Sequence, residues 1–347
     1  MLMRQRTILL LGALAFLLGV HSAQSAGIST HIEVADRAAL EVDASAYAEL
    51  SGVVQAWPVA LRSGSIYPDW GYLLEEYSAA AEDAHWGPFR KLAMDYHRTA
   101  YPQPWSSPHA ERVLAFFMGI GVHGRTDDVW HFGNNAFLPE AMANDLVDVD
   151  PEQAELVIEV LVDFFTQQDH RPNSEKTRLW VPLNDILAVH ESAGHLNLSR
   201  QAIFLGTSAQ SVAYFLEDLL WPYIAPLGAL ITPWSRANYL AWPNGGVEDS
   251  ASRSARAMER LWDHRMSGTT QSSGGHPSQQ LQQAKLQHNN QKLLSIARDL
   301  LESGAIDASW KEDAHGAIHF TTPVVHRWDL VWMALDPIVE LLGESKR

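Results

Sequence analysis

The sequence of 347 residues contains no cysteine. This absence excludes disulfide bonds, thiolate zinc sites, iron–sulfur clusters and a cysteine nucleophile. Basic residues are also scarce, because 25 Lys and Arg stand against 41 Asp and Glu and give a formal net charge of −16. A broad basic face for nucleic acid is therefore not expected. Histidine and carboxylate side chains are left as the strong metal ligands, and the 16 histidines make imidazole plentiful.

Long apolar runs are rare, and the clearest one is Thr7–Val20, which follows a short basic start. It is shorter than the roughly 20 apolar residues that a membrane-spanning helix needs. Small and polar residues come next, up to Ser25, as in the cleavage region of a secretory signal. We predict that residues 1–25 are a signal peptide, that the mature chain begins at Ala26, and that the product is secreted or periplasmic.

Strand-like alternation is nearly absent, and apolar residues recur at helical spacing through most of the chain. The expected helices are Ile32–Ser51, Leu73–Ala84, Phe89–Tyr101, Glu111–His131, Pro151–Gln168, Val181–Ala193, Ala209–Tyr223, Asp249–Met266, Asn290–Ser303 and Trp328–Leu342. A short hairpin is expected at His315–Thr322. The pattern predicts an all-α domain over residues 26–266, a flexible polar segment over residues 267–290 and a C-terminal helical extension over residues 291–347.

The helix expected at Glu111–His131 is apolar except for one polar stripe. His123, Asp127 and His131 follow one another at a spacing of four residues, so they lie on one helix face. Imidazole nitrogen and carboxylate oxygen at this spacing are suitable zinc ligands. The alternative interpretation is a solvent-exposed face that carries a His–Asp pair.

The helix expected at Pro151–Gln168 repeats this spacing with Glu155, Glu159 and Asp163. Three carboxylates on one face repel one another unless they meet water or a cation. An ordinary solvent-exposed helix face explains them as well, and from the spacing alone that interpretation is favoured.

Other candidate ligands lie earlier in the chain, at His31, Asp69 and His85. Taken singly, each residue is more often structural than a ligand. Together with the stripe that begins at His123, they form an ordered series behind the expected free N-terminus at Ala26.

These residues stand in stretches that resemble the zinc-dependent phospholipase C family, and most closely its branch that cleaves glycosylphosphatidylinositol. The stretches are Ser29–Glu33, Tyr67–Tyr72, Ala84–Phe89, Tyr101–Trp105, Leu114–Ile120, and His123–Asp127 with Trp130–His131. Weaker similarity continues to about residue 266. The resemblance implies an all-helical fold, which single-strand-specific nucleases share, and a cluster of up to three zinc ions.

The resemblance also implies which residues bind each ion. The first zinc would take Ala26, His31 and Asp127, the second would take Asp69, His85, His123 and the bridging Asp127, and the third would take His131 with a later His-x-x-x-acid helix. The later helix departs from this pattern, because it offers Glu155 and Glu159 and no histidine. Either Glu155 replaces the imidazole or the third site is weak or empty.

The function implied by the resemblance is that of a secreted hydrolase of the phospholipase C or D type. It would cleave the phosphodiester of a phospholipid or glycosylphosphatidylinositol headgroup with water activated by zinc. Asp69 would be both a ligand and the catalytic proton acceptor. The expected partners are the lipid substrate and, transiently, a membrane surface, with no stable nucleic acid partner. The oligomeric state is left open.

Three alternatives remain open at this point. One is a single-strand nuclease or nucleotidase of the same fold, and another is a non-catalytic lipid- or partner-binding relative with a partly lost zinc site. The third is a di-iron carboxylate protein, because Glu82-x-x-His85 and Glu312-x-x-His315 both match its Glu-x-x-His signature.

Overall fold

The computed structural model describes residues 27–72, 74–105, 107–132, 135–170, 179–268 and 291–331. The predicted signal peptide and Ala26 lie outside these residues. Most of the polar segment predicted over residues 267–290, and most of the helix predicted at Trp328–Leu342, also lie outside them.

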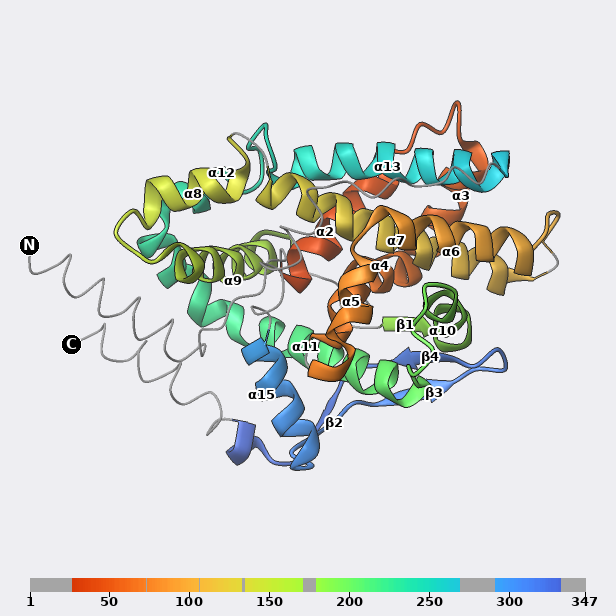
Figure 1. Ribbon diagram of the computed structural model, residues 1–347. Coiled ribbons are helices and arrows are strands. Elements are labelled where there is room, and N and C mark those ends of the chain that lie inside the picture. Colours follow the sequence, from red (N-terminus) through yellow and green to blue (C-terminus); the bar gives the residue numbers. More distant parts are fainter. Residues whose placement is uncertain are drawn as a thin grey trace, which may run out of the picture.

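Helices make up most of the described chain (Figure 1), which confirms the predicted all-α class. The α-helices are α2 (Ile28–Glu41), α3 (Ala48–Ala56), α4 (Pro58–Ile66), α5 (Ser78–Ala84), α6 (Gly87–Ala100), α7 (Pro108–His131), α8 (Phe137–Asp145), α9 (Pro151–His170), α10 (Leu183–Ser192), α11 (Arg200–Ile231), α12 (Pro233–Asn238), α13 (Val247–Ser267) and α15 (Gln291–Glu302). Two 3-10 helices, η1 (Tyr67–Gly71) and η2 (Glu75–Tyr77), lie between α4 and α5. Among the described residues, no helix combines the length and the apolar character that crossing a membrane requires.

The single helix predicted at Ile32–Ser51 is in fact two helices, α2 and α3. The side chain of Asp43 accepts hydrogen bonds from the backbone N–H and the hydroxyl of Ser45, at 2.9 and 2.6 Å. Such a local turn competes with helical hydrogen bonding, so it ends the first helix and redirects the chain.

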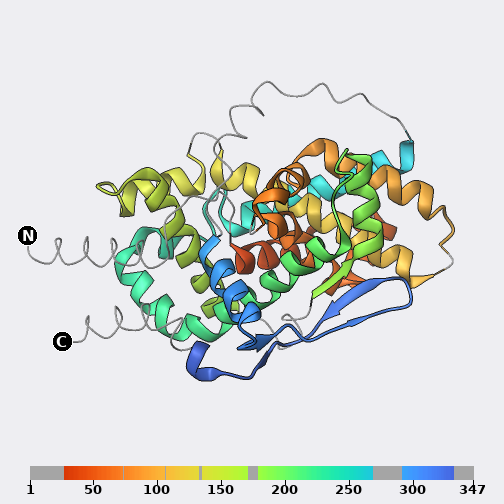
Figure 2. The same ribbon diagram turned by 60° about the horizontal axis from the view of Figure 1, so that its bottom comes forward.

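Short antiparallel strands form the few β elements. They are β1 (Leu179–Pro182), β2 (Ile306–Asp307), β3 (Trp310–Glu312), β4 (Ala317–Phe320) and β5 (Val324–Val325). The predicted hairpin contains β4, which pairs with β3 on one side and with β1 on the other. The helix predicted to begin at Val181 was placed two residues too early, because that residue belongs to a fully buried strand. In Figure 2 the C-terminal strands run along one side of the helical body.

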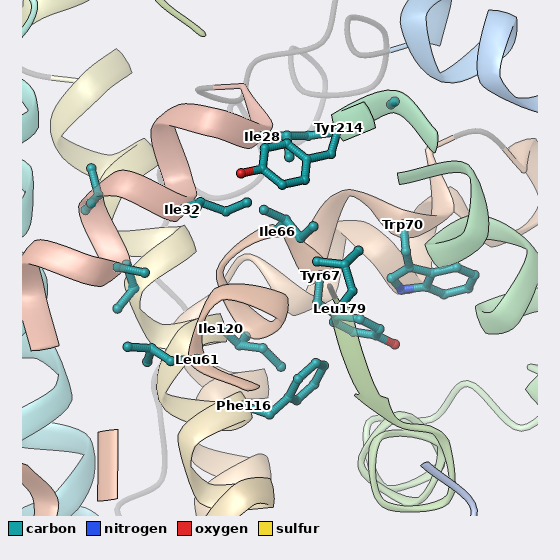
Figure 3. Close-up of a cluster of buried hydrophobic side chains, with 14 of the residues drawn as sticks. Ile28, Ile32, Leu61, Ile66, Tyr67, Trp70, Phe116, Ile120, Leu179 and Tyr214 are labelled. Carbon is teal, nitrogen blue, oxygen red and sulfur yellow. The ribbon is translucent and has the colours of Figure 1, made fainter. Parts of the chain in front are cut away.

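The main hydrophobic core connects elements from across the chain, as Figure 3 shows for one part of it. The labelled side chains are Ile28 and Ile32 of α2, Leu61 and Ile66 of α4, Tyr67 and Trp70 of η1, Phe116 and Ile120 of α7, Leu179 of β1 and Tyr214 of α11. All of them are buried, so α2, α4 and α7 are fixed to one another by apolar contact.

Helices α4 and α7 cross at two glycines. A Cβ atom on Gly64 would lie 1.9 Å from the carbonyl oxygen of Phe116, and one on Gly119 would lie 2.1 Å from that of Leu61. The two backbones therefore touch, and no side chain fits between them. Because η1 directly follows α4, this crossing sets the position of Asp69 relative to the polar stripe of α7.

We expect Gly119→Ala to lower the free energy of unfolding by about 1–3 kcal/mol, because the added methyl group forces the two helices apart. Gly52→Ala is the matched control, since nothing lies within 4 Å of a Cβ at that position of α3. The control should be neutral or stabilising by up to about 1 kcal/mol. Urea denaturation at one fixed zinc concentration measures both, and equal effects would contradict the close crossing.

Candidate metal centre

The predicted ligands within the described residues come from five parts of the fold. His31 lies in the first turns of α2, Asp69 on η1, and His85 directly after α5. The stripe of α7 and the acidic stripe of α9 complete the set. Because α2 packs against both α7 and α9 (Figure 1), these side chains meet in one buried region.

His31, His123 and Asp127 form a first group of potential metal donors. The Nε2 atom of His31 lies 3.3 Å from Oδ1 of Asp127. The imidazole rings of His31 and His123 are stacked, with centroids 4.0 Å apart. All three side chains are almost completely buried.

Asp69, His85 and His123 form a second group beside the first. Nε2 of His85 lies 3.1 Å from Oδ1 of Asp69, and Nε2 of His123 lies 3.7 Å from the same oxygen. Oδ2 of Asp127 is 3.1 Å from Nε2 of His123 and 3.9 Å from that of His85. One oxygen of Asp127 thus faces each group, which is the geometry of a bridging carboxylate.

His131, Glu155 and Glu159 form a third group. Nδ1 of His131 lies 3.1 Å from Glu155, and its Nε2 lies 3.4 Å from Glu159. Glu159 and Asp163 are only 4% and 3% exposed. The interpretation of the acidic stripe as a solvent-exposed face is therefore wrong, because α9 turns these carboxylates toward α7 and α2.

Backbone carbonyl groups orient two of the imidazole rings. Nδ1 of His123 donates to the carbonyl of Ser65 at 2.7 Å, and Nδ1 of His85 donates to that of Ala81 at 2.9 Å. A proton on Nδ1 leaves the lone pair on Nε2, so each ring offers that atom to the centre.

The di-iron alternative is not supported by the placement of its two motifs. Glu82 accepts hydrogen bonds from the hydroxyl of Tyr72 and the indole of Trp86, at 2.9 and 2.7 Å. Glu312 is exposed and pairs with Arg200, and neither glutamate belongs to a donor group found among the described residues.

The electrostatics of the three groups call for positive charge. Burial, and then the charges of Glu155 and Asp127, raise the pKa of Glu159 well above its usual range. Burial opposes ionisation of Asp127, but His123 and His31 outweigh it and hold the pKa of Asp127 well below normal. For His85, burial is outweighed by the carboxylate of Asp69, which raises its pKa to about 9.

Several buried nitrogen and oxygen atoms that could bind a metal ion have no hydrogen-bond partner within the described part of the chain. They are both carboxylate oxygens of Asp127, Nε2 of His123, Nε2 of His131 and Oε1 of Glu159. Buried polar atoms without partners are costly unless something else binds them. A divalent cation satisfies such atoms, and a donor set of imidazole nitrogen and carboxylate oxygen without sulfur fits zinc.

One predicted ligand cannot be placed, because Ala26 lies outside the described residues. The first described residue is Gly27, whose carbonyl accepts a hydrogen bond from the backbone N–H of His31 at 3.1 Å. The N-terminal ligand therefore stays a prediction, as does the catalytic role of Asp69.

Two residues of this region carried no assigned role in the sequence. Asp163 shares the predicted acidic stripe but contacts the start of α2 and not the α7 histidines. Glu217 of α11 also reaches the start of α2. No spacing signal marks Glu217, because its partner is far away in the sequence.

Comparison with known proteins agrees with this geometry. Residues 30–153 match the sequence profile of the family described as zinc dependent phospholipase C. The chain is 25% identical to the human phosphatidylinositol-glycan-specific phospholipase D over 244 residues, or 67% of this chain and 28% of that protein. The rat protein of the same name is 27% identical over 240 residues, with 66% and 28% coverage.

A shorter match, 31% identical over 130 residues, joins the chain to the same enzyme of Dictyostelium discoideum and covers 37% of this chain and 14% of that protein. The chain thus spans less than a third of the length of these relatives. No solved structure gives a significant match. Through its N-terminal helical region the chain is related to the zinc-dependent phospholipase C family, with phosphatidylinositol-glycan-specific phospholipases D among its relatives.

Proposed function

We propose that this protein is a zinc-dependent phosphodiesterase that hydrolyses the headgroup linkage of a phospholipid or a glycosylphosphatidylinositol. The observation that carries the proposal is the set of three adjacent donor groups, two of which share His123 and face the two oxygens of Asp127. The family relationship supports a phosphodiester as the bond that is broken.

We propose up to three zinc ions, held by the three donor groups. Bound zinc would neutralise the oxygens of the phosphodiester and make water a stronger nucleophile at neutral pH. The chain itself fixes the donors: His85 and His123 are locked by their Nδ1 hydrogen bonds, and Asp127 faces both of the first two groups. Asp69 is the proposed acceptor for the proton of the attacking water.

The same observations argue against two competing functions, a nuclease and a non-catalytic relative. A nuclease would bind a polyanion, which a chain of net charge −16 repels, and the relatives found are named as phospholipases. A non-catalytic relative would be expected to lack part of the centre. The contact between Glu155 and His131 supports the proposal that Glu155 takes the role of the missing histidine in a working third group.

We further propose that the enzyme acts outside the cytoplasm and contacts membranes only transiently. The support is the predicted signal peptide over residues 1–25, together with the lipid nature of the proposed substrate.

Metal removal and a bridging-ligand variant test the proposed function. A chelator should abolish release of a glycosylphosphatidylinositol-anchored protein or hydrolysis of phosphatidylcholine, and added zinc should restore the activity. Asp127→Asn should lower the rate by at least about 100-fold, because the carboxylate that faces two donor groups is lost. Single-stranded DNA should be hydrolysed slowly or not at all.

Asp128→Asn is the matched control, since that neighbouring carboxylate pairs with Arg125 at 3.4 Å and belongs to none of the donor groups. Its rate should change by less than about threefold, as for a partly exposed ion pair. Activity that survives complete zinc removal, or DNA as the best substrate, would overturn the proposal.

A second prediction concerns the third donor group. The double variant Glu155→Ala and Glu159→Ala should bind about one zinc ion fewer per chain, because two of three donors are removed. Glu152→Ala, on an exposed position of the same helix, should retain the full content. Elemental analysis of the purified proteins measures both, and an unchanged zinc content in the double variant would show that this group holds no metal.

A further inference from the structure

Beside the candidate metal centre, two acidic side chains from distant helices reach the first turn of α2. Asp163 comes from α9 and Glu217 from α11. They are 3% and 4% exposed, so both carboxyl groups are removed from water. Burial of two acidic groups is unfavourable unless they are well hydrogen-bonded, and this calls for a reason.

Asp163 caps α2 from outside the helix. Its Oδ1 atom accepts from the backbone N–H of Thr30 at 2.9 Å and from the hydroxyl of Thr30 at 2.6 Å, and Asp163 also accepts from the backbone of Ser29. The helix has no cap of its own, because the N-cap residue is Gly27 and its first turn contains no acid. Asp163 therefore supplies the partner that the first N–H groups of a helix need.

Glu217 completes this arrangement. The hydroxyl of Ser29 donates to Oε2 of Glu217 at 2.5 Å and accepts from the amide of Gln167 at 2.7 Å. The two carboxyl groups also interact electrostatically, because each acts on the pKa of the other. Burial raises the pKa of both, which favours a pair that holds one proton between its members.

The contact with Asp163 leaves no room for a side chain at Gly27. A Cβ atom there would lie 1.6 Å from Oδ2 of Asp163. The φ angle of Gly27 is −70°, which any residue adopts. Glycine is thus required at this position for space and not for backbone freedom.

The first turn of α2 leads directly to His31. This side chain is completely buried, lies 3.3 Å from Asp127 and stacks on His123. A shift of the turn by the width of a methyl group would move the imidazole out of both contacts. We propose that Asp163 and Glu217 are positioning residues that hold His31 in the first donor group. The link to zinc, though not the placement of His31, rests on the proposed function.

Four variants separate this role from general stability. Asp163→Ala removes the cap, and Gly27→Ala displaces Asp163 by steric overlap. Asp163→Asn is the conservative rescue, because its amide oxygen can accept from Thr30 while its NH₂ group donates to Glu217. Gly52→Ala is the control for adding a methyl group where space is open.

Two measurements are made on each purified chain after removal of the predicted signal peptide. Carbethoxylation of histidines by diethyl pyrocarbonate, mapped by mass spectrometry before and after chelation, reports the accessibility of His31 against His123. Zinc titration reports the number and affinity of bound ions. In Asp163→Ala and Gly27→Ala we expect His31 to become modified while His123 stays protected, and one zinc ion to bind about 10- to 100-fold more weakly.

Asp163→Asn and Gly52→Ala should match the unaltered protein in both measurements. Equal exposure of His31 and His123 would mean general loosening and would overturn the proposal, as would a protected His31 in both disruptive variants. If the unaltered protein binds no zinc but His31 is still exposed selectively, the positioning role stands and the proposed function fails. If the unaltered protein binds zinc but His31 stays protected in the disruptive variants, the positioning role fails and the proposed function stands.

Discussion

The arrangement of this protein depends on one electrostatic constraint, the burial of several carboxylates around Asp127. Asp69, Asp127 and Glu159 are all at most 5% exposed. Imidazoles compensate part of this charge, which is why the pKa of Asp127 falls despite its burial. The pKa of Glu159 rises, first because it is buried and then because its neighbours are acidic. Such a cluster is stable only with bound cations or protons. The close crossing of α4 and α7 brings its potential metal ligands together.

The burial of carboxylates also bears on the third donor group, which has Glu155 where the family pattern implies a histidine. In the proposed third zinc site, Glu155 would take the place of the imidazole that the resemblance implies, and it would add an anion next to Glu159 and His131. An added anion strengthens the attraction for a divalent cation. It also leaves less net positive charge to attract a phosphodiester. On the proposed function, a carboxylate at this position would strengthen metal binding and weaken substrate binding.

Local spacing was enough to predict that the ligands of α7 share a face, because the helical period relates residues that are close in sequence. Spacing alone could not distinguish a face that meets water from one that meets histidines, so it favoured the wrong interpretation of the acidic stripe of α9, whereas the family resemblance predicted Glu155 and Glu159 as partners of His131. The break after α2 depends on the Asp43 side chain, and the pairing of β1 with β4 joins segments far apart in the chain. The cap by Asp163 and Glu217 is likewise a long-range contact that no spacing shows.

The charge of the chain limits how the proposed substrate is reached. A net charge of −16 repels anionic surfaces, but at physiological salt this repulsion fades beyond about 8 Å. Attraction for a phosphodiester must therefore be local and arise at the metal centre. Lipid surfaces without net charge, on which a cationic headgroup balances the phosphate, repel the acidic chain least. Long-range charge therefore does not assist the approach of the proposed substrate. Its recognition must depend on short-range contacts at the buried candidate metal centre.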